Sequence, residues 1–297
     1  MCKLFGISRQ SYYQGLDRQA KKKEEQKDIV TKVVEIRKRH KHMGGKKLYS
    51  KLVSKFKEDN IKCGRDKLFY ILREENLLVK YKKRYIKTTD SKHLFRKYTN
   101  LIQELDINRA EQVFASDITY IRTSKGFMYL FLITDVYSKQ IMGWELSDNM
   151  KVINAIKALK MAVKNRKYPK RKLIHHSDRG IQYCNPAYIE ELNKNNISVS
   201  MTTKYDPYEN AVAERVNGIL KMEYDIGGKF VGLKDAMREI KYAIWLYNTD
   251  RPHLSCHGLV PIEAHLKENY KLKKWAKNFS TKGYPLVEKR LSLDLNF

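Results

Sequence analysis

The sequence predicts an α/β protein in which an all-α region precedes a mixed β-sheet flanked by helices. In the first third of the chain, apolar residues recur at helical spacing between polar and basic ones. After about residue 110 the pattern changes to three short runs with the character of strands. Strand and helix patterns then alternate, which is typical of a sheet covered by helices.

Basic residues are in large excess and are concentrated near the N-terminus. The 297 residues include 60 lysines and arginines against 33 aspartates and glutamates, a net charge of +27. Residues 1–100 hold 29 basic and 11 acidic side chains. This balance favours a polyanionic partner, although a solvated basic surface, as on a ribosome-associated protein, would give the same charge.

Cysteine spacing and hydropathy exclude other classes of protein. Cys2, Cys63, Cys184 and Cys256 lie far apart, so neither a zinc ribbon nor a disulfide framework is indicated. The longest apolar run, 127–133, is too short to cross a bilayer, and no signal peptide precedes it. We therefore expect a cytoplasmic protein with no membrane partner.

The first 20 residues have the pattern of half a helix-turn-helix. A turn at Gly6 precedes a helix capped by Ser8. The first helix of such a motif would need residues upstream of Met1, which suggests a partner polypeptide that supplies them. A frayed N-terminal helix is the competing interpretation.

Residues 21–87 form the main helical DNA-binding region that we expect. Helices are predicted at 21–40, after the Gly44-Gly45 pair and at about 65–75. The segment 45–78 would be a helix-turn-helix that presents Arg65 and Lys67 to DNA, because a recognition helix reads the groove with its N-terminal residues. Three-helix packing without DNA would look similar.

A basic segment and a linker follow these helices. Residues 81–87, YKKRYIK, interleave tyrosines with cations, so Lys82, Lys83 and Arg84 are candidate phosphate contacts. A solvated linker would also fit this segment. Weak periodicity places the domain boundary at 88–110, before a domain at 111–265 and a basic tail at 266–297.

The second domain has the predicted order βββαβαβα. Its first three strands, 112–121, 127–135 and 140–146, have short connections and should form an antiparallel meander. The later elements are a helix at 152–163, a strand at 173–176, a helix starting at Pro186 after the cap Asn185, a strand at 197–200 and a helix at 210–223. A further amphipathic helix is expected at 233–247.

Three carboxylates in this domain are candidate metal ligands. Asp117 lies within the first strand, where an unpaired carboxylate would be costly to bury. Asp178 follows the strand 173–176 directly, and Glu214 lies on the helix 210–223. Each alone could be a helix cap or an ion-pair partner. Together they suit two-metal phosphoryl transfer, with oxygen ligands that favour Mg²⁺ or Mn²⁺ over zinc.

The helix that carries Glu214 adds a polar stripe. Lys221 follows Glu214 by seven residues, close to two helical turns, so both side chains share a face. Asn210 and Asn217 lie on the same face. We expect Lys221, Asn210 and Asn217 to contact DNA beside the metal ligand, whereas an ordinary solvent-facing stripe would leave the strand carboxylates unexplained.

Three acidic motifs make a family resemblance visible: FASDITYI around Asp117, HHSDRGIQY around Asp178, and YDPYENAVAERVNGILKME around Glu214. They resemble the DDE transposases of bacterial two-frame insertion sequences, in particular the downstream-frame product. The 35 residues between Asp178 and Glu214 agree with this family. GGKKLYSKLVSKF, LFYILREENLL and WLYNTDRPHLSCHGLVPIEA resemble its helix-turn-helix and C-terminal segments, so the likeness covers almost the whole chain.

The resemblance implies a ribonuclease H-like, integrase-core fold and a transposase that cleaves and joins DNA strands. It implies that Asp117, Asp178 and Glu214 hold two magnesium ions and that Lys221 contacts the transposon end. His176 and Gln182 match family positions without a clear role, and Phe114 stands where the family more often has tryptophan. His40 and His42 do not combine with cysteines, so no structural zinc is expected.

The implied partners are double-stranded DNA, as terminal inverted repeats and target, and further copies of the chain assembled on it. An upstream-frame polypeptide or a frameshift fusion would complete the enzyme, and the location would be the bacterial nucleoid. Two alternatives stay open: a ribonuclease H-like nuclease, and a catalytically silent DNA-binding regulatory product.

Overall fold

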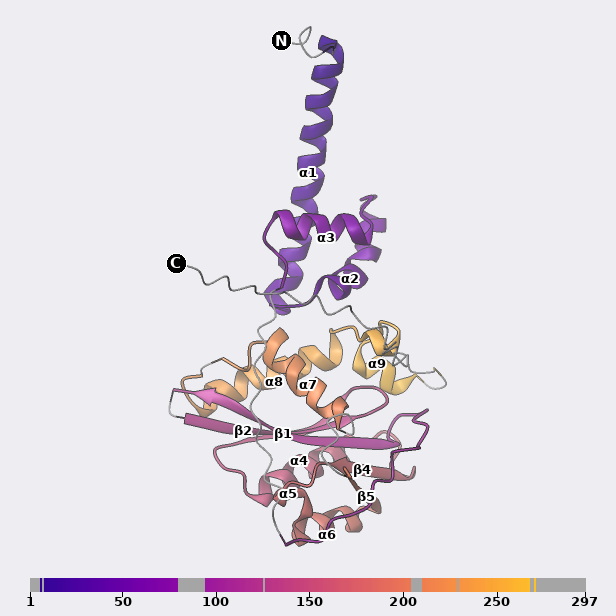
Figure 1. Ribbon diagram of the computed structural model, residues 1–297, viewed down its shortest axis with the longest axis vertical. Helices are drawn as coiled ribbons and strands as arrows, with labels where there is room; N and C mark the ends of the chain where they lie inside the picture. Colours follow the sequence, from indigo (N-terminus) through magenta and orange to yellow (C-terminus); the bar gives the residue numbers. More distant parts are fainter. Residues whose placement is uncertain are drawn as a thin grey trace, which may run out of the picture.

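The chain forms a helical unit joined to a domain built on one β-sheet (Figure 1). The computed structural model describes residues 6, 8–79, 94–124, 126–203, 210–228, 230–267 and 270. The segment containing Lys82, Lys83 and Arg84 lies outside the described residues, as does nearly all of 266–297. In the part of the chain that is described, no helix has the length and apolar character needed to cross a membrane.

Three helices make up the helical unit: α1 (Arg9–Arg39), α2 (Gly45–Glu58) and α3 (Arg65–Glu74). Their buried apolar residues share one core, as the helical spacing predicts. That core contains Ile29, Val33, Ile36, Met43, Leu48, Leu52, Phe56, Cys63, Leu68, Ile71 and Leu72. The predicted arrangement of three helices with a turn before Arg65 is confirmed.

The N-terminal division of this unit needs correction, because α1 is one continuous helix. It begins after Ser8, whose side chain accepts a hydrogen bond from Ser11 N at 3.1 Å, as predicted. The boundary placed after residue 20 therefore falls inside a helix. Residues 18–27 are mainly Lys, Arg, Gln, Glu and Ala, strong helix formers that give the chain no reason to stop. The N-terminal part of α1 projects beyond the three-helix core (Figure 1).

The second domain contains a five-stranded mixed sheet in the order β3-β2-β1-β4-β5. β1 (Val113–Thr123), β2 (Gly126–Asp135) and β3 (Ile141–Ser147) form the predicted antiparallel meander. β4 (Leu173–Ser177) and β5 (Ile197–Met201) run parallel to β1. This is the strand arrangement of the ribonuclease H-like fold, and it confirms the predicted α/β class.

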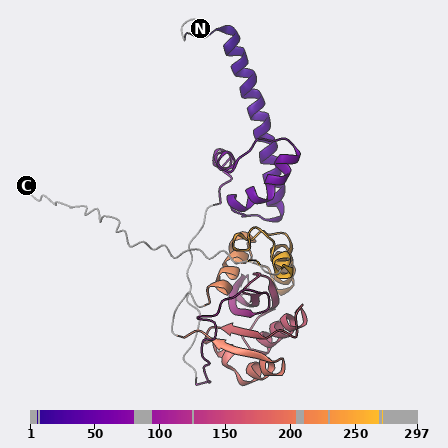
Figure 2. The ribbon, with the colours of Figure 1, turned by 90° about the vertical axis from the view of Figure 1, so that its right-hand side faces the viewer.

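Helices cover both faces of the sheet (Figures 1 and 2). On one face lie α4 (Val152–Lys164), α5 (Ile181–Cys184) and α6 (Pro186–Lys194). The other face carries α7 (Ala211–Glu223) and α8 (Leu233–Thr249), followed by η1 (Leu254–Cys256) and α9 (Pro261–Leu266). The short elements α5, η1 and α9 were not predicted, because none is long enough to show a helical period.

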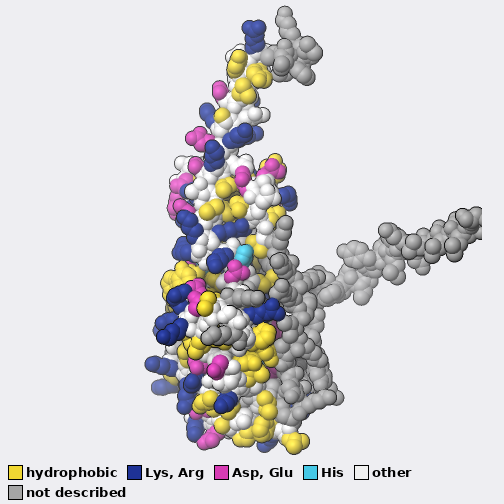
Figure 3. Space-filling model, turned by 90° about the vertical axis from the view of Figure 1, so that its left-hand side faces the viewer, with side chains coloured by type: hydrophobic (Ala, Val, Ile, Leu, Met, Phe, Trp, Pro, Cys, Tyr) yellow, Lys and Arg dark blue, Asp and Glu magenta, His cyan; other side chains and the backbone are white. Residues whose placement is uncertain are grey.

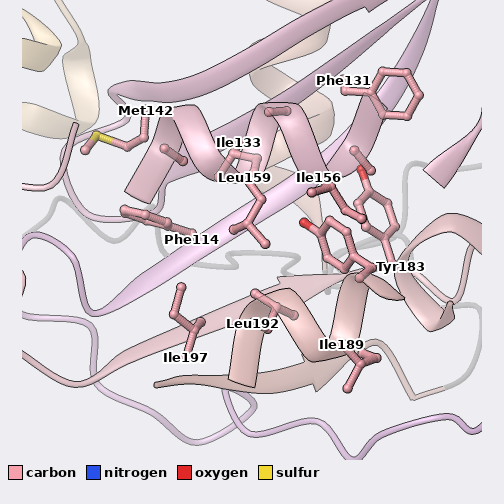
Figure 4. Packing of buried hydrophobic residues seen from close by; sticks show 14 of the residues in the cluster. Phe114, Phe131, Ile133, Met142, Ile156, Leu159, Tyr183, Ile189, Leu192 and Ile197 are labelled. Atoms are coloured by element: carbon pink, nitrogen blue, oxygen red, sulfur yellow. The ribbon is translucent and has the colours of Figure 1, made fainter. Parts of the chain in front are cut away.

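The core between the sheet and α4 is closely packed (Figure 4). Phe114 is fully buried there, so the aromatic ring that replaces the family's tryptophan has a packing role. Gly143 of β3 faces α4, and a Cβ at this position would lie only 2.1 Å from the carbonyl oxygen of Ala158. The close approach of α4 to the sheet therefore requires glycine at residue 143.

Most of the expected linker belongs to the sheet domain. Residues 94–110, which we call the strap, form no helix or strand, yet several of their apolar side chains pack against the domain. Phe95 and Tyr98 contact the core on the α4 side, and Ile102, Leu105 and Ile107 contact a cluster around Val113. The strap also reaches β5, since Leu101 N donates to Ser200 Oγ at 2.9 Å. The boundary at 110 is therefore too late for the packed domain.

Candidate active site

Asp117 of β1 and Asp178, directly after β4, lie at the same level of two neighbouring parallel strands. The β1–β4 register pairs Ala115 with His176 and Ser116 with Ser177, and each aspartate is the next residue along the chain. Residues in register on parallel strands point to the same face of the sheet. The two carboxylates therefore meet where β4 ends, at the carboxyl edge of a parallel pair.

Local hydrogen bonds orient both carboxylates. Asp117 Oδ2 accepts from Asn217 Nδ2 at 2.7 Å, and Asp117 Oδ1 accepts from Ile118 N at 2.9 Å. Asp178 Oδ1 accepts from Gly180 N at 3.0 Å. A Cβ at Gly180 would lie 3.0 Å from this same oxygen, so glycine keeps the turn after Asp178 open.

Helix α7 brings Glu214 and Lys221 to the same place. The helix is tied to β1 at its start, where Asn210 Nδ2 donates to Ser116 O at 3.0 Å, and again at Asn217. Glu214 is in the exposed first turn and Lys221 is half-buried two turns later. The predicted face shared by Glu214, Asn217 and Lys221 is thus turned towards Asp117.

The pKa values reveal that these groups interact. Burial, followed by the negative charge of Asp178, raises the pKa of Asp117 to about 7. The pKa of Glu214 is also raised, by burial and then by Asp178. Burial lowers the pKa of Lys221, and attraction to Asp117 opposes that shift. The carboxylates of Asp117, Asp178 and Glu214 and the ammonium of Lys221 therefore interact electrostatically at this edge of the sheet.

Within the described residues, no three Asp, Glu, His or Cys side chains already converge closely enough to form a metal cluster. Glu214 is exposed on the first turn of α7, whereas local hydrogen bonds orient the carboxylates of Asp117 and Asp178.

Asn210 and Asn217 do not have the exposure expected of DNA contacts. Their side chains are 7% and 5% exposed and donate to Ser116 and Asp117, respectively. Both asparagines lie on the side of α7 that faces β1, so the polar stripe points partly inward. We assign them to holding α7 and the Asp117 carboxylate in place.

The other predicted DNA contacts that are described lie at the start of α3. The side chains of Arg65 and Lys67 are 59% and 43% exposed. Lys67 Nζ lies 2.9 Å from Glu25 Oε2 of α1, and Arg65 bonds to Asp66. Both cations remain accessible to a phosphate. Lysine and arginine side chains also occur along the face drawn in Figure 3, from α1 to the sheet domain.

His176 and Gln182, the two further residues that match family positions, both form hydrogen bonds within the sheet domain. His176 is buried and its Nδ1 lies 2.9 Å from Ser200 Oγ of β5. Gln182 Nε2 donates to Met150 O at 3.1 Å. The neighbouring His175 is bonded to Ser116 and Tyr188, and burial lowers its pKa to about 3. These contacts assign His175 and His176 to the core beneath the site.

Sequence reasoning missed an ionic junction between the helical unit and the sheet domain. We define it as Glu223, Asp250 and Arg251 of the sheet domain together with His40, Lys47 and Lys51 of the helical unit. Its pairs are Glu223–Arg251 at 2.8 Å, Glu223–Lys47 at 2.5 Å, Asp250–His40 at 2.8 Å and Asp250–Lys51. The run DRPH at 250–253 belongs to a segment that resembles the family, but nothing in this run indicates that Asp250 pairs with His40, 210 residues earlier in the chain.

Comparison with known proteins agrees with the fold, and the matched ranges include Asp117, Asp178 and Glu214. Two family models, both described as integrase core domain, match residues 107–207 and 195–261. The "Insertion element IS600 uncharacterized 31 kDa protein" of Shigella sonnei is 33% identical over 275 residues, covering 91% of this chain and 98% of that protein.

The "Transposase InsF for insertion sequence IS3A" of Escherichia coli K12 is 35% identical over 193 residues, covering 64% of this chain and 66% of that protein. Among solved structures, the HTLV-2 integrase catalytic core domain in complex with magnesium is 18% identical, with a TM-score of 0.43. That match covers 53% of this chain and 97% of the viral chain. The assignment rests on the sequence relatives and the integrase-core models: this chain belongs to the DDE-type transposases of bacterial insertion sequences.

Proposed function

We propose that Asp117, Asp178 and Glu214 hold two divalent cations, Mg²⁺ or Mn²⁺, and that this site cleaves transposon ends and joins them to target DNA. The observation that carries the proposal is that Asp117 within β1, Asp178 directly after β4 and Glu214 on α7 influence one another's charge. Two such ions, when bound, activate an attacking oxygen and stabilise the leaving one during displacement at a phosphate.

The donor set fits such ions. All three side chains offer carboxylate oxygens, which hard cations prefer. Asp117 has a pKa of about 7 because its charge is buried beside that of Asp178. A bound cation would relieve this repulsion, so it would displace the proton from Asp117.

The remaining residues around the site bind and orient. Asn217 donates to one oxygen of Asp117 and thereby leaves a defined face of the carboxylate for a ligand. Lys221 shares that face of α7 and is suited to hold a phosphate of the transposon end as a point charge. Arg65 and Lys67 of α3, with Lys82, Lys83 and Arg84, would contact the duplex farther from the cut.

The partners that follow are double-stranded terminal inverted repeats, target DNA and further copies of the chain assembled on them. An upstream-frame polypeptide or frameshift fusion would add DNA-binding structure before residue 1. A general nuclease and a silent regulatory product are disfavoured, because the family is that of the transposases and all three carboxylates are intact.

Substitution of the carboxylates tests this function. In Asp117→Asn, Asp178→Asn and Glu214→Gln we expect cleavage of labelled element ends to fall by about a thousandfold or more, because the ions provide the charge stabilisation. Duplex binding, measured by fluorescence anisotropy, should stay close to that of the unaltered chain. Glu190→Gln, at an exposed acid of α6, is the matched control.

Lys221 separates a transposase from a general nuclease in the same experiment. Lys221→Ala should weaken binding and joining of pre-cleaved ends, and Lys221→Arg should recover part of both. Cleavage within tenfold of the unaltered chain in any carboxylate variant would remove that residue from the site. A Lys221→Ala defect that excess magnesium fully corrects would assign Lys221 to ion binding instead of DNA binding.

A further inference from the structure

The ionic junction joins the helical unit to the C-terminal ends of α7 and α8. Glu223 is the last residue of α7, the helix that carries Glu214 and Lys221. Asp250 directly follows α8, which packs beside α7 on the same face of the sheet. From the helical unit, Lys47 and Lys51 lie one turn apart at the start of α2.

Burial distinguishes the junction from ordinary surface ion pairs. Side-chain exposure is 13% for Lys47 and 6% for Glu223, and it is 19% for Lys51 and 23% for Asp250. His40, between Asp250 and Tyr224, is 1% exposed. Exposed pairs contribute little and reorient freely, whereas breaking a buried pair leaves a charge without its partner.

Further hydrogen bonds restrict how the helical unit is oriented on the sheet domain. Tyr224 Oη lies 3.1 Å from His40 Nδ1, and His42 N donates to Glu223 O at 3.3 Å. Lys51 Nζ also donates to the backbone carbonyl of Asp250 at 2.8 Å. Contacts to backbone and side chains at two helix ends leave few ways for the helical unit to rotate on the sheet domain.

This docking relates the DNA-facing helix to the site. α3 shares one buried core with α2, so it cannot move independently of Lys47 and Lys51. α7 is held to β1 by Asn210 and Asn217. A continuous path of packed elements therefore runs from the start of α3 to Asp117.

We propose that Glu223 and Asp250 are positioning residues that determine which phosphodiester is cleaved, by holding the helical unit at a fixed place relative to the carboxylates. Neither touches DNA in this role. They set the offset between the base pairs held by α3 and the phosphate presented to the site. The inference rests on the proposed function, since it concerns where that site cuts.

Charge reversal across the junction tests the proposal in the full-length chain. The probe is an end-labelled duplex containing the element's terminal inverted repeat, and the readout is the cut position at single-nucleotide resolution. For Lys51→Glu and for Asp250→Lys we expect cuts spread over neighbouring phosphates, with cleavage at the main position reduced by about tenfold or more. The double variant, Lys51→Glu with Asp250→Lys, restores this one pair and should return cleavage part of the way towards one position, because Arg39, 3.3 Å from Asp250 in the unaltered chain, and His40 still face residue 250.

Lys55→Glu is the matched control, because Lys55 is exposed one turn further along α2. It carries the same loss of positive charge towards DNA and should keep a single cut position. Circular dichroism and duplex affinity establish that each variant is folded and binds. A folded, DNA-binding Lys51→Glu chain that still cuts at one unchanged position would overturn the proposal, as would equal loss in Lys55→Glu.

Hydroxyl-radical footprints without added metal give a second readout that needs no cleavage. The unaltered chain should protect the repeat and the cut region together, and Lys51→Glu should lose protection at the cut region first. An unaltered chain that does not cleave rejects the proposed function. An unchanged footprint in Lys51→Glu rejects the positioning role, whatever the cleavage result.

Discussion

Acidic side chains at the sheet edge and at the ionic junction have pKa values that move in opposite directions. At the sheet edge, burial and the charge of Asp178 raise the pKa of Asp117 to about 7. At the ionic junction, burial also acts to raise the pKa of Glu223, but the hydrogen bonds and positive charges of Arg251 and Lys47 together outweigh it, so the pKa is lowered. The pKa of Asp250 is lowered in the same way, by Lys51 and His40.

The difference separates acids whose charge is stabilised by cations of the chain from an acid whose charge is costly in the fold. Cations from both parts of the molecule bond to the junction carboxylates, so their charge contributes to stability. At the sheet edge, burial and the charge of Asp178 make the ionised form of Asp117 unfavourable. A raised pKa in a group of acids at a sheet edge is thus a better indicator of function than acidity alone.

Removing a cation from the junction should have the largest effect on stability. Arg251 is 1% exposed and bonds both oxygens of Glu223, at 2.8 and 2.9 Å. Arg251→Met leaves a buried carboxylate underpaired, so we expect the free energy of unfolding to fall by about 3–5 kcal/mol. Urea denaturation measures it. Arg238→Met, at a 74% exposed arginine of α8, should cost under about 1 kcal/mol. Equal losses in the two variants would show that the buried Glu223–Arg251 pair contributes no more to stability than an exposed ion pair.

Removing a charge from the site should instead stabilise the fold. The folded pKa of Asp117 lies above its unfolded value, so the folded chain holds an extra proton between pH about 4 and 7 and loses stability as pH rises through that window. Asp117→Asn avoids this cost, and we expect it to be more stable by about 2–4 kcal/mol at pH 8 without metal.

The gain from Asp117→Asn should disappear near pH 4, where the unaltered aspartate is protonated in the folded chain. Thermal unfolding across this range measures both ends of the window. Magnesium should raise the melting temperature of the unaltered chain more than that of the variant. A variant that is less stable than the unaltered chain at pH 8 would contradict the electrostatic account of the site.

Asp250 should give the smallest effect, with the opposite pH dependence. Its folded pKa lies below the unfolded value, so its contribution is present above pH about 4 and is lost as pH falls through the folded pKa. We expect Asp250→Asn to lower the free energy of unfolding by about 1–2 kcal/mol at pH 7. Once the pH lies below the folded pKa of Asp250, the two chains should converge. Urea titrations from pH 7 down into this acidic range measure the change, and a constant difference would assign the effect to packing.

Sequence reasoning recovered most of the elements because their signals are local. The cap at Ser8, the pair Asn185-Pro186 and the apolar stripes of α2 and α3 each predict structure from adjacent residues. Asp117 was found because a carboxylate in an apolar strand is unusual, and Asp178 because it directly follows a strand. Glu214 and Lys221 were found because they share a helix face, and the family resemblance gave specificity to a spacing that is otherwise common.

What could not be read from the sequence depends on contacts between distant residues. Polar asparagines on α7 look alike whether they face DNA or β1, so the burial of Asn210 and Asn217 was unforeseen. The strap has no periodicity, because it packs on the domain through separate side chains. The pairing of His40 with Asp250 spans 210 residues and leaves no pattern in either segment.

The distribution of these contacts along the chain also sets the order in which the protein can fold as it is made. The core of the helical unit is complete once residue 77 has been synthesised. The site must wait for Lys221, and the junction for Arg251. At about 5–20 residues per second, translation separates residue 77 from Lys221 by about 7–29 s, and Arg251 follows about 2–6 s later. Each nascent chain therefore has a folded helical unit before it has an active site, and its docking onto the sheet domain is among the last steps of its maturation.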